Sequence, residues 1–272
     1  MTSVSTRALA MSTLIVLLLP FAGCSGRKRG VTGVGSIVAA DNFDRAMKLL
    51  SERQLRQATS ALTRIRFDPA TRAEIEPLTR LAIADAAFYQ GTSLGWIDSR
   101  TKYINFVTLN ANHPLAPYAQ LQVGQCSLKQ VNAPAKDQSV TRQAIRDFEQ
   151  VETRWPESDY IVAARALMRQ ARSRLAESEY LVGRFYLKKK SYLAAIERFR
   201  VVVDRFPDYY ELEKVLFHLG QAHLRSGNQL EGRVFMDRLI NDYPQGDYIG
   251  KARKALGSVG AGFETDLGPG SQ

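Results

Sequence analysis

Residues 179–207 read EYLVGRFYLKKKSYLAAIERFRVVVDRFP and contain the clearest structural signal in the chain. Gly183 and Ala195 are small at points where two antiparallel helices must approach each other closely. Tyr186 and Phe199 are large enough to fill the space on either side. Pro207 ends the stretch, because proline lacks an amide donor and clashes with the preceding helical turn. The stretch therefore predicts a hairpin of two helices closed by a proline.

The offsets of these five residues are those of the tetratricopeptide repeat. Similar but weaker units precede and follow this one, and each of them ends at a proline. The prolines stand in the motifs Phe67-Asp68-Pro69, Asn112-His113-Pro114, Arg154-Trp155-Pro156, Arg205-Phe206-Pro207 and Asp242-Tyr243-Pro244. They are further apart than the usual spacing of about 34 residues, so we expect several lengthened helices or loops.

Apolar residues recur at helical spacing between Asp41 and Leu256, without a convincing run of alternating strand residues. The predicted fold is all-α, an α-α superhelix in the form of a tetratricopeptide-repeat solenoid of about five repeats over residues 41–256. In such a stack each helix pair buries its apolar stripe against its neighbours, and no pair is stable alone. This geometry suits the binding of extended peptides or partner domains better than small-molecule chemistry.

The composition is that of a globular protein. The chain has 272 residues, 45% of them hydrophobic, with 37 basic and 27 acidic side chains and a net charge of +10. Intrinsic disorder is therefore excluded for most of its length. Two cysteines cannot build a disulfide framework, and three scattered histidines offer little for a metal site. We expect no metal and no cofactor.

The first 23 residues predict a lipoprotein signal peptide. Arg7 is the only charged residue before residue 27, and the apolar run Leu14 to Pro20 follows it. The segment ends in Ala-Gly-Cys, which resembles the lipobox of bacterial lipoproteins, in which the cysteine is acylated and becomes the new N-terminus. We therefore expect Cys24 to be lipidated; the alternative is an ordinary secretory peptide with a chance cysteine. Residues 24–40 read as a flexible tether, and residues 257–272 as a disordered tail.

Three sequence features that could indicate catalysis have simpler explanations. Residues 91–95 match the nucleophile motif G-x-S-x-G, but a helical stretch precedes them where that motif requires a strand, so we expect a turn within a repeat. His218 and His223 are five residues apart and point about 140° away from each other on a helix. Cys126 is expected to be a small buried hydrophobe rather than a reactive thiol. We predict no catalytic residue and no enzyme.

Most of the positive charge lies in one region. Residues 165–205 contain eleven cations and four carboxylates, a local excess of +7. Arg165, Arg169 and Arg172 follow an i, i+4, i+7 spacing and form one stripe on a helix. The stripe is either a solvated outer face or an electropositive surface that steers an acidic partner domain. Nucleic acid is the weakest candidate partner, because the predicted signal peptide exports the chain from the compartment that contains nucleic acid.

Several short motifs follow one another in the middle of the chain: His113-Pro114, Pro117-Tyr118-Ala119, Lys136-Asp137-Gln138 before Ala144-x-x-x-Phe148, Arg154-Trp155-Pro156-Glu157-Ser158-Asp159-Tyr160, Leu175-Ala176-Glu177-Ser178-Glu179-Tyr180 and Ala194-Ala195-Ile196-Glu197-Arg198. In order and spacing they resemble the BamD family, the tetratricopeptide lipoproteins of the outer-membrane β-barrel assembly machinery. The resemblance covers about 41–256 and is most specific from Asn112 to Pro207. The first departure is Phe67-Asp68-Pro69-Ala70, where the family has an aromatic-Pro-x-Ser motif.

The resemblance implies a set of partners. In the family the C-terminal repeats contact the periplasmic domains of the barrel-forming subunit, and Arg198 matches an arginine of that contact surface. The alternative for Arg198 is a helix-surface arginine paired with its neighbours Glu197 or Asp204. The N-terminal repeats of the family are implicated in recognising the targeting segment of unfolded barrel proteins.

These observations predict a non-enzymatic scaffold, anchored by lipid on Cys24 to the periplasmic face of the outer membrane. It would bind the barrel-forming subunit, with Arg198, Arg165, Arg169 and Arg172 as partner-binding residues, and help insert unfolded outer-membrane proteins. Two alternatives stay open: a periplasmic tetratricopeptide adaptor for envelope constriction or polysaccharide export, and a cell-wall lytic enzyme on a helical superhelix. The last of these needs a buried glutamate in a cleft.

Overall fold

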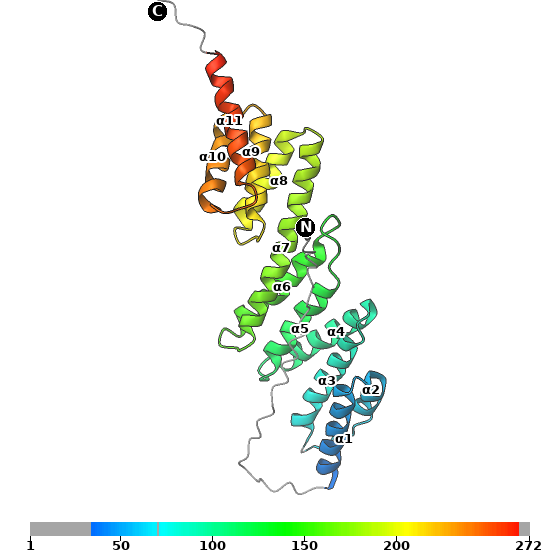
Figure 1. Cartoon of the computed structure of the whole chain (residues 1–272). Coiled ribbons are helices and arrows are strands. Elements are labelled where there is room, and N and C mark those ends of the chain that lie inside the picture. The colour runs from blue at the N-terminus through cyan, green and yellow to red at the C-terminus, as the bar shows by residue number, and fades with distance from the viewer. Residues whose placement is uncertain (1–33, 70, 267–272) are drawn as a thin grey trace, which may run out of the picture. The chain divides into compact units, whose positions relative to one another are not determined.

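The computed structural model describes residues 34–69 and 71–266, and within them the chain forms eleven α-helices and no strand (Figure 1). Ten of these helices pair in chain order into five antiparallel hairpins, and the eleventh follows the last hairpin. The hairpins are α1 (Val34–Ser51) with α2 (Leu55–Thr63), α3 (Arg72–Tyr89) with α4 (Ser93–Leu109), α5 (Ala116–Lys129) with α6 (Ser139–Arg154), α7 (Ile161–Lys188) with α8 (Tyr192–Arg205), and α9 (Leu212–Arg225) with α10 (Gln229–Asp242), followed by α11 (Ile249–Asp266).

Each of the five punctuating prolines lies between one hairpin and the next helix. Pro69 precedes α3, for example, and Pro244 precedes α11. The predicted all-α superhelix of about five tetratricopeptide repeats is therefore confirmed. Its weak N-terminal units are complete hairpins in spite of their poor sequence signature.

Close helix contact explains the pattern of small and large residues. A Cβ atom added to Gly183 would lie 2.6 Å from Cε1 of Phe199, which is closer than two carbon atoms can approach. In the third hairpin the same geometry recurs, with an added Cβ on Gly124 only 2.4 Å from Cε1 of Phe148. Phe199 and Phe148 are completely buried. The ring on the second helix of each hairpin thus packs onto the bare backbone of the first.

The buried side chains of the described residues form four consecutive core clusters rather than one. The first joins α1, α2 and α3, the second α3, α4 and α5, and the third α5, α6 and α7. The fourth extends from α7 through α11. Consecutive clusters share a helix, so every hairpin is stabilised by its neighbours, as expected for a solenoid.

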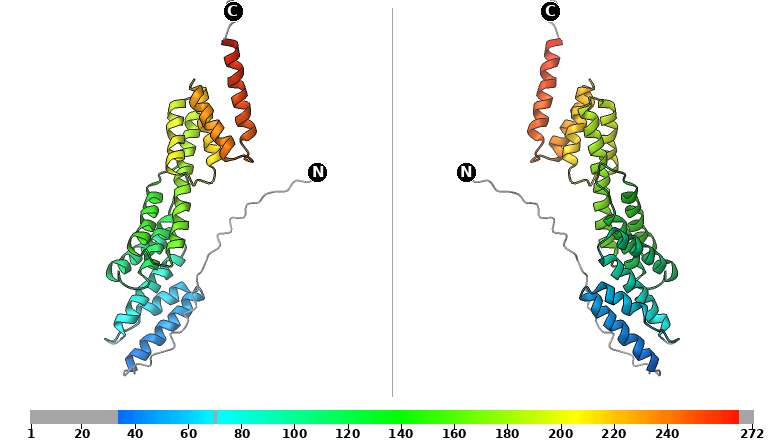
Figure 2. Two further views of the ribbon diagram at one scale, coloured as in Figure 1. Left: turned by 90° about the vertical axis from the view of Figure 1, so that its left-hand side faces the viewer. Right: turned by 90° about the vertical axis from the view of Figure 1, so that its right-hand side faces the viewer.

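Helix α7 is the longest, with 28 residues, whereas its partner α8 has 14. Its first half contributes Ala164 to the cluster with Phe148 on α6. Its second half contributes Ala176 and Tyr180 to the cluster with Phe199 on α8. Figure 2 shows α7 running without a break from the green helices to the yellow ones. This long helix accounts for the wide spacing between Pro156 and Pro207.

Both ends of the solenoid differ from the predicted boundaries. Helix α1 begins at Val34, inside the segment expected to be a tether, and Ala39 is buried in the first core cluster. Helix α11 continues to Asp266, inside the segment expected to be a disordered tail. Glycine costs a helix only about 1 kcal/mol per residue, so it does not stop a helix that has already formed. The predicted signal peptide (residues 1–23), Cys24, residues 25–33 and residues 267–272 lie outside the described residues.

Candidate partner-binding surface

Arg198 lies on α8, and its Nη1 atom is 3.0 Å from Oε2 of Glu179 on α7. The ion pair therefore joins the two helices of the fourth hairpin, instead of linking Arg198 to Glu197 or Asp204 on its own helix. The Arg198 side chain is still 45% exposed. Its guanidinium is held in one place and remains open to solvent on the outer side of that contact.

The stripe of Arg165, Arg169 and Arg172 is partly used inside the protein. Arg165 pairs with Glu152 of α6. Arg172 donates a hydrogen bond of 2.8 Å to the carbonyl oxygen of Arg205, where α8 ends. Arg165 and Arg172 thus tie α7 to helices on either side, and Arg169 with Arg172 lines a small surface cavity beside the loop after α8. No hydrogen bond or ion pair among the described residues links Arg198 to the stripe.

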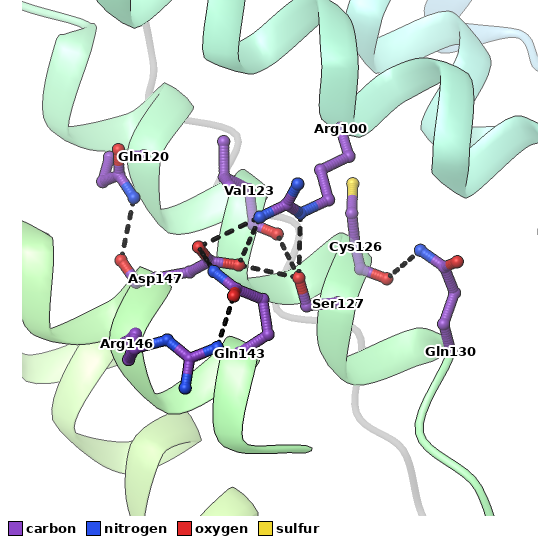
Figure 3. Close-up of polar contacts among 9 residues, drawn as sticks. All are labelled: Arg100, Gln120, Val123, Cys126, Ser127, Gln130, Gln143, Arg146 and Asp147. Atoms are coloured by element: carbon purple, nitrogen blue, oxygen red, sulfur yellow. Dashed lines mark hydrogen bonds and ion pairs between the residues drawn. The ribbon is translucent and has the colours of Figure 1, made fainter. Parts of the chain in front are cut away.

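A buried polar network joins the second and third hairpins (Figure 3). Arg100 on α4 donates through Nη2 to both carboxylate oxygens of Asp147 on α6, each at 3.1 Å, and through Nε to Ser127 on α5 at 3.0 Å. Ser127 and Gln143 donate to the same carboxylate at 2.7 and 2.8 Å. The Asp147 side chain is only 8% exposed. The Asp147 carboxylate thus accepts hydrogen bonds from side chains of α4, α5 and α6 and holds these three helices together.

A second carboxylate, Asp85 on α3, is shared between three helices. Tyr103 of α4 and Tyr118 of α5 both donate their hydroxyls to its Oδ1 atom, Tyr118 at 2.9 Å. Burial raises the pKa of Asp85 from 3.8 to about 6, although the two hydroxyl donors oppose that shift. The sequence pattern did not predict this cluster. A single carboxylate within the alanine-rich stretch Leu81 to Phe88 was the available signal, but its partners could not be known.

The raised pKa of Asp85 predicts an unusual pH dependence of stability. Between pH 4 and 6 the folded state binds more protons than the unfolded state, so the free energy of unfolding falls as the pH rises through this window. Asp85→Asn removes the titration, and its stability relative to the wild type should increase by about 1 to 2 kcal/mol from pH 4 to pH 7, after allowing for solvent screening. Urea unfolding at several pH values measures this difference. Asp98→Asn on α4, whose carboxylate is exposed, is the control. If the difference in unfolding free energy between Asp85→Asn and the wild type were the same at every pH from 4 to 7, the prediction would be wrong.

Residues that resembled catalytic groups are structural. Cys126 is fully buried, as predicted, and burial raises the pKa of its thiol to about 12, so it is unreactive. Gly91 and Thr92 lie in the turn between α3 and α4, as predicted, and Ser93 to Gly95 begin α4. Gly91 has φ +70°, and the side chain of Thr92 caps α4 by accepting a 3.0 Å hydrogen bond from the amide of Gly95.

The described part of the chain contains no group of three or more histidine, cysteine, aspartate or glutamate side chains placed to hold a metal ion. None of its helices is both long and apolar enough to cross a membrane.

Comparison with known proteins gives matches over most of the chain. The family model YfiO, described as outer membrane lipoprotein, matches residues 39–233. The outer membrane protein assembly factor BamD of Rickettsia prowazekii is 26% identical over 246 residues, covering 90% of this chain and 96% of that protein. BamD of Caulobacter vibrioides is 33% identical over 128 residues, covering 47% of this chain and 42% of the relative.

Among solved structures, the TPR2AB-domain:pHSP90 complex of yeast Sti1 is 15% identical with a TM-score of 0.42, covering 84% of this chain and 88% of that one. That similarity is too distant to add to the fold described above. The match of the family model extends from the first described helix into α10. The chain therefore belongs to the YfiO family of outer membrane lipoproteins.

Proposed function

We propose that the chain is a lipid-anchored scaffold for the assembly of outer-membrane β-barrel proteins. A relative named outer membrane protein assembly factor BamD matches 90% of the chain, and the family is one of outer membrane lipoproteins. In this proposal acylated Cys24 holds the protein on the periplasmic face of the outer membrane. Its C-terminal hairpins bind the periplasmic domains of the barrel-forming subunit, and the stack helps to bring unfolded outer-membrane proteins to that subunit.

The mechanism is geometric. Stacked hairpins keep two surfaces at a fixed separation. An unfolded chain bound at one surface is therefore held close to the barrel-forming subunit bound at the other. No bond is made or broken. A cell-wall lytic enzyme would need a buried glutamate in a cleft, and every glutamate from Glu52 to Glu231 is at least partly exposed, which supports a scaffold over that alternative.

The observation that carries this proposal is the pairing of Arg198 with Glu179. A long arginine side chain normally loses rotamer freedom when it binds a partner. Because Glu179 already holds Arg198 at 3.0 Å, much of that loss has occurred before binding. A carboxylate of the partner can then form charge-assisted hydrogen bonds with the exposed part of the guanidinium.

Arg198→Glu should weaken binding of the barrel-forming subunit by about 2 kcal/mol, roughly 30-fold, if the partner's carboxylate is desolvated in the complex. Copurification with that subunit in mild detergent, followed by titration with its periplasmic domains, measures the effect. Arg200→Glu is the matched control, because Arg200 is also exposed on α8 and makes no ion pair among the described residues.

Reversal of the pair by Glu179→Arg with Arg198→Glu separates binding from stability. The double variant restores an ion pair within the hairpin and should regain its thermal stability, yet it should still bind the subunit weakly. Unchanged copurification of the Arg198→Glu protein, or an equal loss with Arg200→Glu, would refute the role of Arg198.

A further inference from the structure

The outward side of helix α4 carries a row of exposed, uncharged side chains. This row, which we call the α4 stripe, consists of Leu94, Ile97, Thr101, Ile104 and Thr108. Leu94 is 80% exposed and Ile97 52%. The opposite side of α4 packs into the core cluster that it shares with α3 and α5. The α4 stripe therefore takes no part in the packing between hairpins.

The two threonines of the α4 stripe add no free hydroxyl donor to it. The hydroxyl of Thr101 donates to the carbonyl oxygen of Ile97 at 3.2 Å, and the hydroxyl of Thr108 donates to that of Ile104 at 2.9 Å. A hydroxyl bonded within its own helix can be covered by a partner without leaving a donor unpaired. The stripe thus acts as an apolar surface along its whole length.

The charged side chains of α4 are also paired within the chain. Asp98 forms an ion pair with Lys102 on the same helix, and Arg100 forms one with Asp147 on α6. These are the three charged residues of α4. The helix therefore offers no unpaired charge to a lipid headgroup or an acidic peptide, so its occupant has to be held by apolar contact.

The second helices of the third and fourth hairpins show how a solvent-facing side is built elsewhere in this protein. Their outward positions carry charged, exposed side chains, which are Arg142, Arg146 and Glu149 on α6, and Glu197, Arg200 and Asp204 on α8. Such charges are typical of the polar face of a surface helix. Three large aliphatic side chains and no charge in the equivalent place on α4 indicate a side that a partner covers.

The spacing of the α4 stripe specifies the shape of that partner. Its members follow one another at intervals of three, four, three and four residues. These are the a and d positions of a heptad repeat, whose side chains fit between those of a second helix. A β-strand presents its side chains with a period of two residues and does not match this spacing. The occupant is therefore helical.

The size of the α4 stripe argues against a second copy of the chain as the occupant. From Leu94 to Thr108 the stripe is about 21 Å long and a helix is about 10 Å wide, so one helix covers roughly 200 Å². A stable dimer needs about 600 Å² or more from each subunit. A contact as small as this one is effective when another contact already holds the same partner nearby.

We propose that the α4 stripe binds an amphipathic helix of a partner protein. The helix lies along α4 and presents its own uncharged aliphatic stripe to Leu94, Ile97 and Ile104. It supplements a larger contact that the same partner makes with the chain. This inference is independent of the proposed function, because the α4 stripe belongs to the second hairpin and Arg198 to the fourth.

Disulfide trapping tests the proposal, because it detects weak binding and also locates it. In the full-length protein Thr101→Cys places a thiol at the centre of the α4 stripe, whereas Cys126 is fully buried. The probe is a synthetic helical peptide with leucine at its a and d positions and one central cysteine, activated as a mixed disulfide with thionitrobenzoate. Attack by the protein thiolate joins peptide to protein and releases thionitrobenzoate, whose absorbance gives the rate. Mass spectrometry confirms that the peptide is attached at residue 101.

The Thr101→Cys protein should react with this peptide about 10-fold faster than Arg200→Cys, a matched variant with its thiol on the outward side of α8. Dividing each rate by the rate with the small reagent dithiobis(nitrobenzoate) removes differences in thiol reactivity. Adding Leu94→Gln and Ile97→Gln to Thr101→Cys should slow trapping about 10-fold or more. Leu193→Gln, at a similarly exposed position on α8, should leave the rate unchanged. Added salt should not slow trapping, because no unpaired charge takes part.

Each further outcome supports or overturns the proposal. Equal rates with a peptide of the same composition whose leucines alternate would overturn it, as would equal rates for Thr101→Cys and Arg200→Cys. Disulfide-linked dimers that form faster through Thr101→Cys than through Arg200→Cys, without peptide, would assign the stripe to a second copy instead. Protection of Thr101→Cys from the small reagent by phosphatidylethanolamine and phosphatidylglycerol vesicles, without peptide trapping, would assign it to a lipid surface.

Two measurements keep these outcomes interpretable. Arg198→Glu should leave peptide trapping at Thr101→Cys unchanged, so failure here is distinguishable from failure of the proposed function. Helical circular dichroism and thermal unfolding of each variant verify that it remains folded.

Discussion

Phe199→Ala is expected to lower the free energy of unfolding by about 4 kcal/mol. The ring is completely buried and lies against the bare backbone of Gly183. On its other sides it is near Tyr180 and His218, with centroids at 5.8 and 6.1 Å. Glycine has no side chain that could move into the space, so the cavity cannot collapse. The free energy lost because the ring is no longer buried and the free energy cost of the remaining cavity therefore add to each other.

Urea unfolding followed by helical circular dichroism measures the effect, and hydrogen exchange locates it. Because solenoids unfold through neighbouring units, loss of protection should be concentrated in α7 to α11, which share one core cluster. Phe185→Ala is the control: it makes the same substitution in the same hairpin at an exposed position, and should change stability by about 0.5 kcal/mol or less. Equal effects of the two substitutions would mean that Phe199 is not the centre of this packing.

Arg100→Met is expected to lower the free energy of unfolding by about 3 kcal/mol, because it leaves the Asp147 carboxylate buried without its counter-ion. Ser127 and Gln143 would remain as donors, but neither carries a positive charge. Removal of the other partner by Asp147→Leu should lower the free energy of unfolding by less. Arg100 is 28% exposed, so its freed guanidinium can turn toward water.

A double-mutant cycle tests this asymmetry. Arg100→Met combined with Asp147→Leu should be more stable than Arg100→Met alone, because no charge is then left buried. Arg238→Met removes a comparable ion pair with Asp242 on the surface of α10 and should cost less than about 1 kcal/mol. Strict additivity of the two changes at Arg100 and Asp147 would show that the buried pair contributes no coupling.

The local rules of helix formation were sufficient to predict the fold. Proline positions marked where hairpins end, and Gly183 with Phe199 marked how their helices meet. The ends of the solenoid were less accurately predicted. Glycine lowers helix propensity without forbidding a helix, so α1 and α11 extend into segments that composition alone assigned to linkers.

The contacts of the site were beyond prediction from the sequence alone. Arg198 pairs with Glu179 on the other helix of its hairpin, and Asp85 accepts a hydrogen bond from Tyr118 on the next hairpin. Such pairs depend on how helices are rotated about their axes, which the repeat pattern fixes only approximately. Tyr180, His218 and Tyr248 come from three successive units, so the contacts between their rings form only when the units are stacked.

Helix α7 has a further consequence, because it belongs to two core clusters at once. At 1.5 Å per residue its 28 residues span about 42 Å, and this rod sets both the separation and the relative rotation of the hairpins at its two ends. An insertion or deletion of one residue in its middle would swing one group of hairpins by about 100° around the other. A change of seven residues would alter their distance by about 10 Å and nearly preserve their orientation. The length of α7 can therefore change during evolution only in steps of whole turns if both ends are to keep facing the same partners.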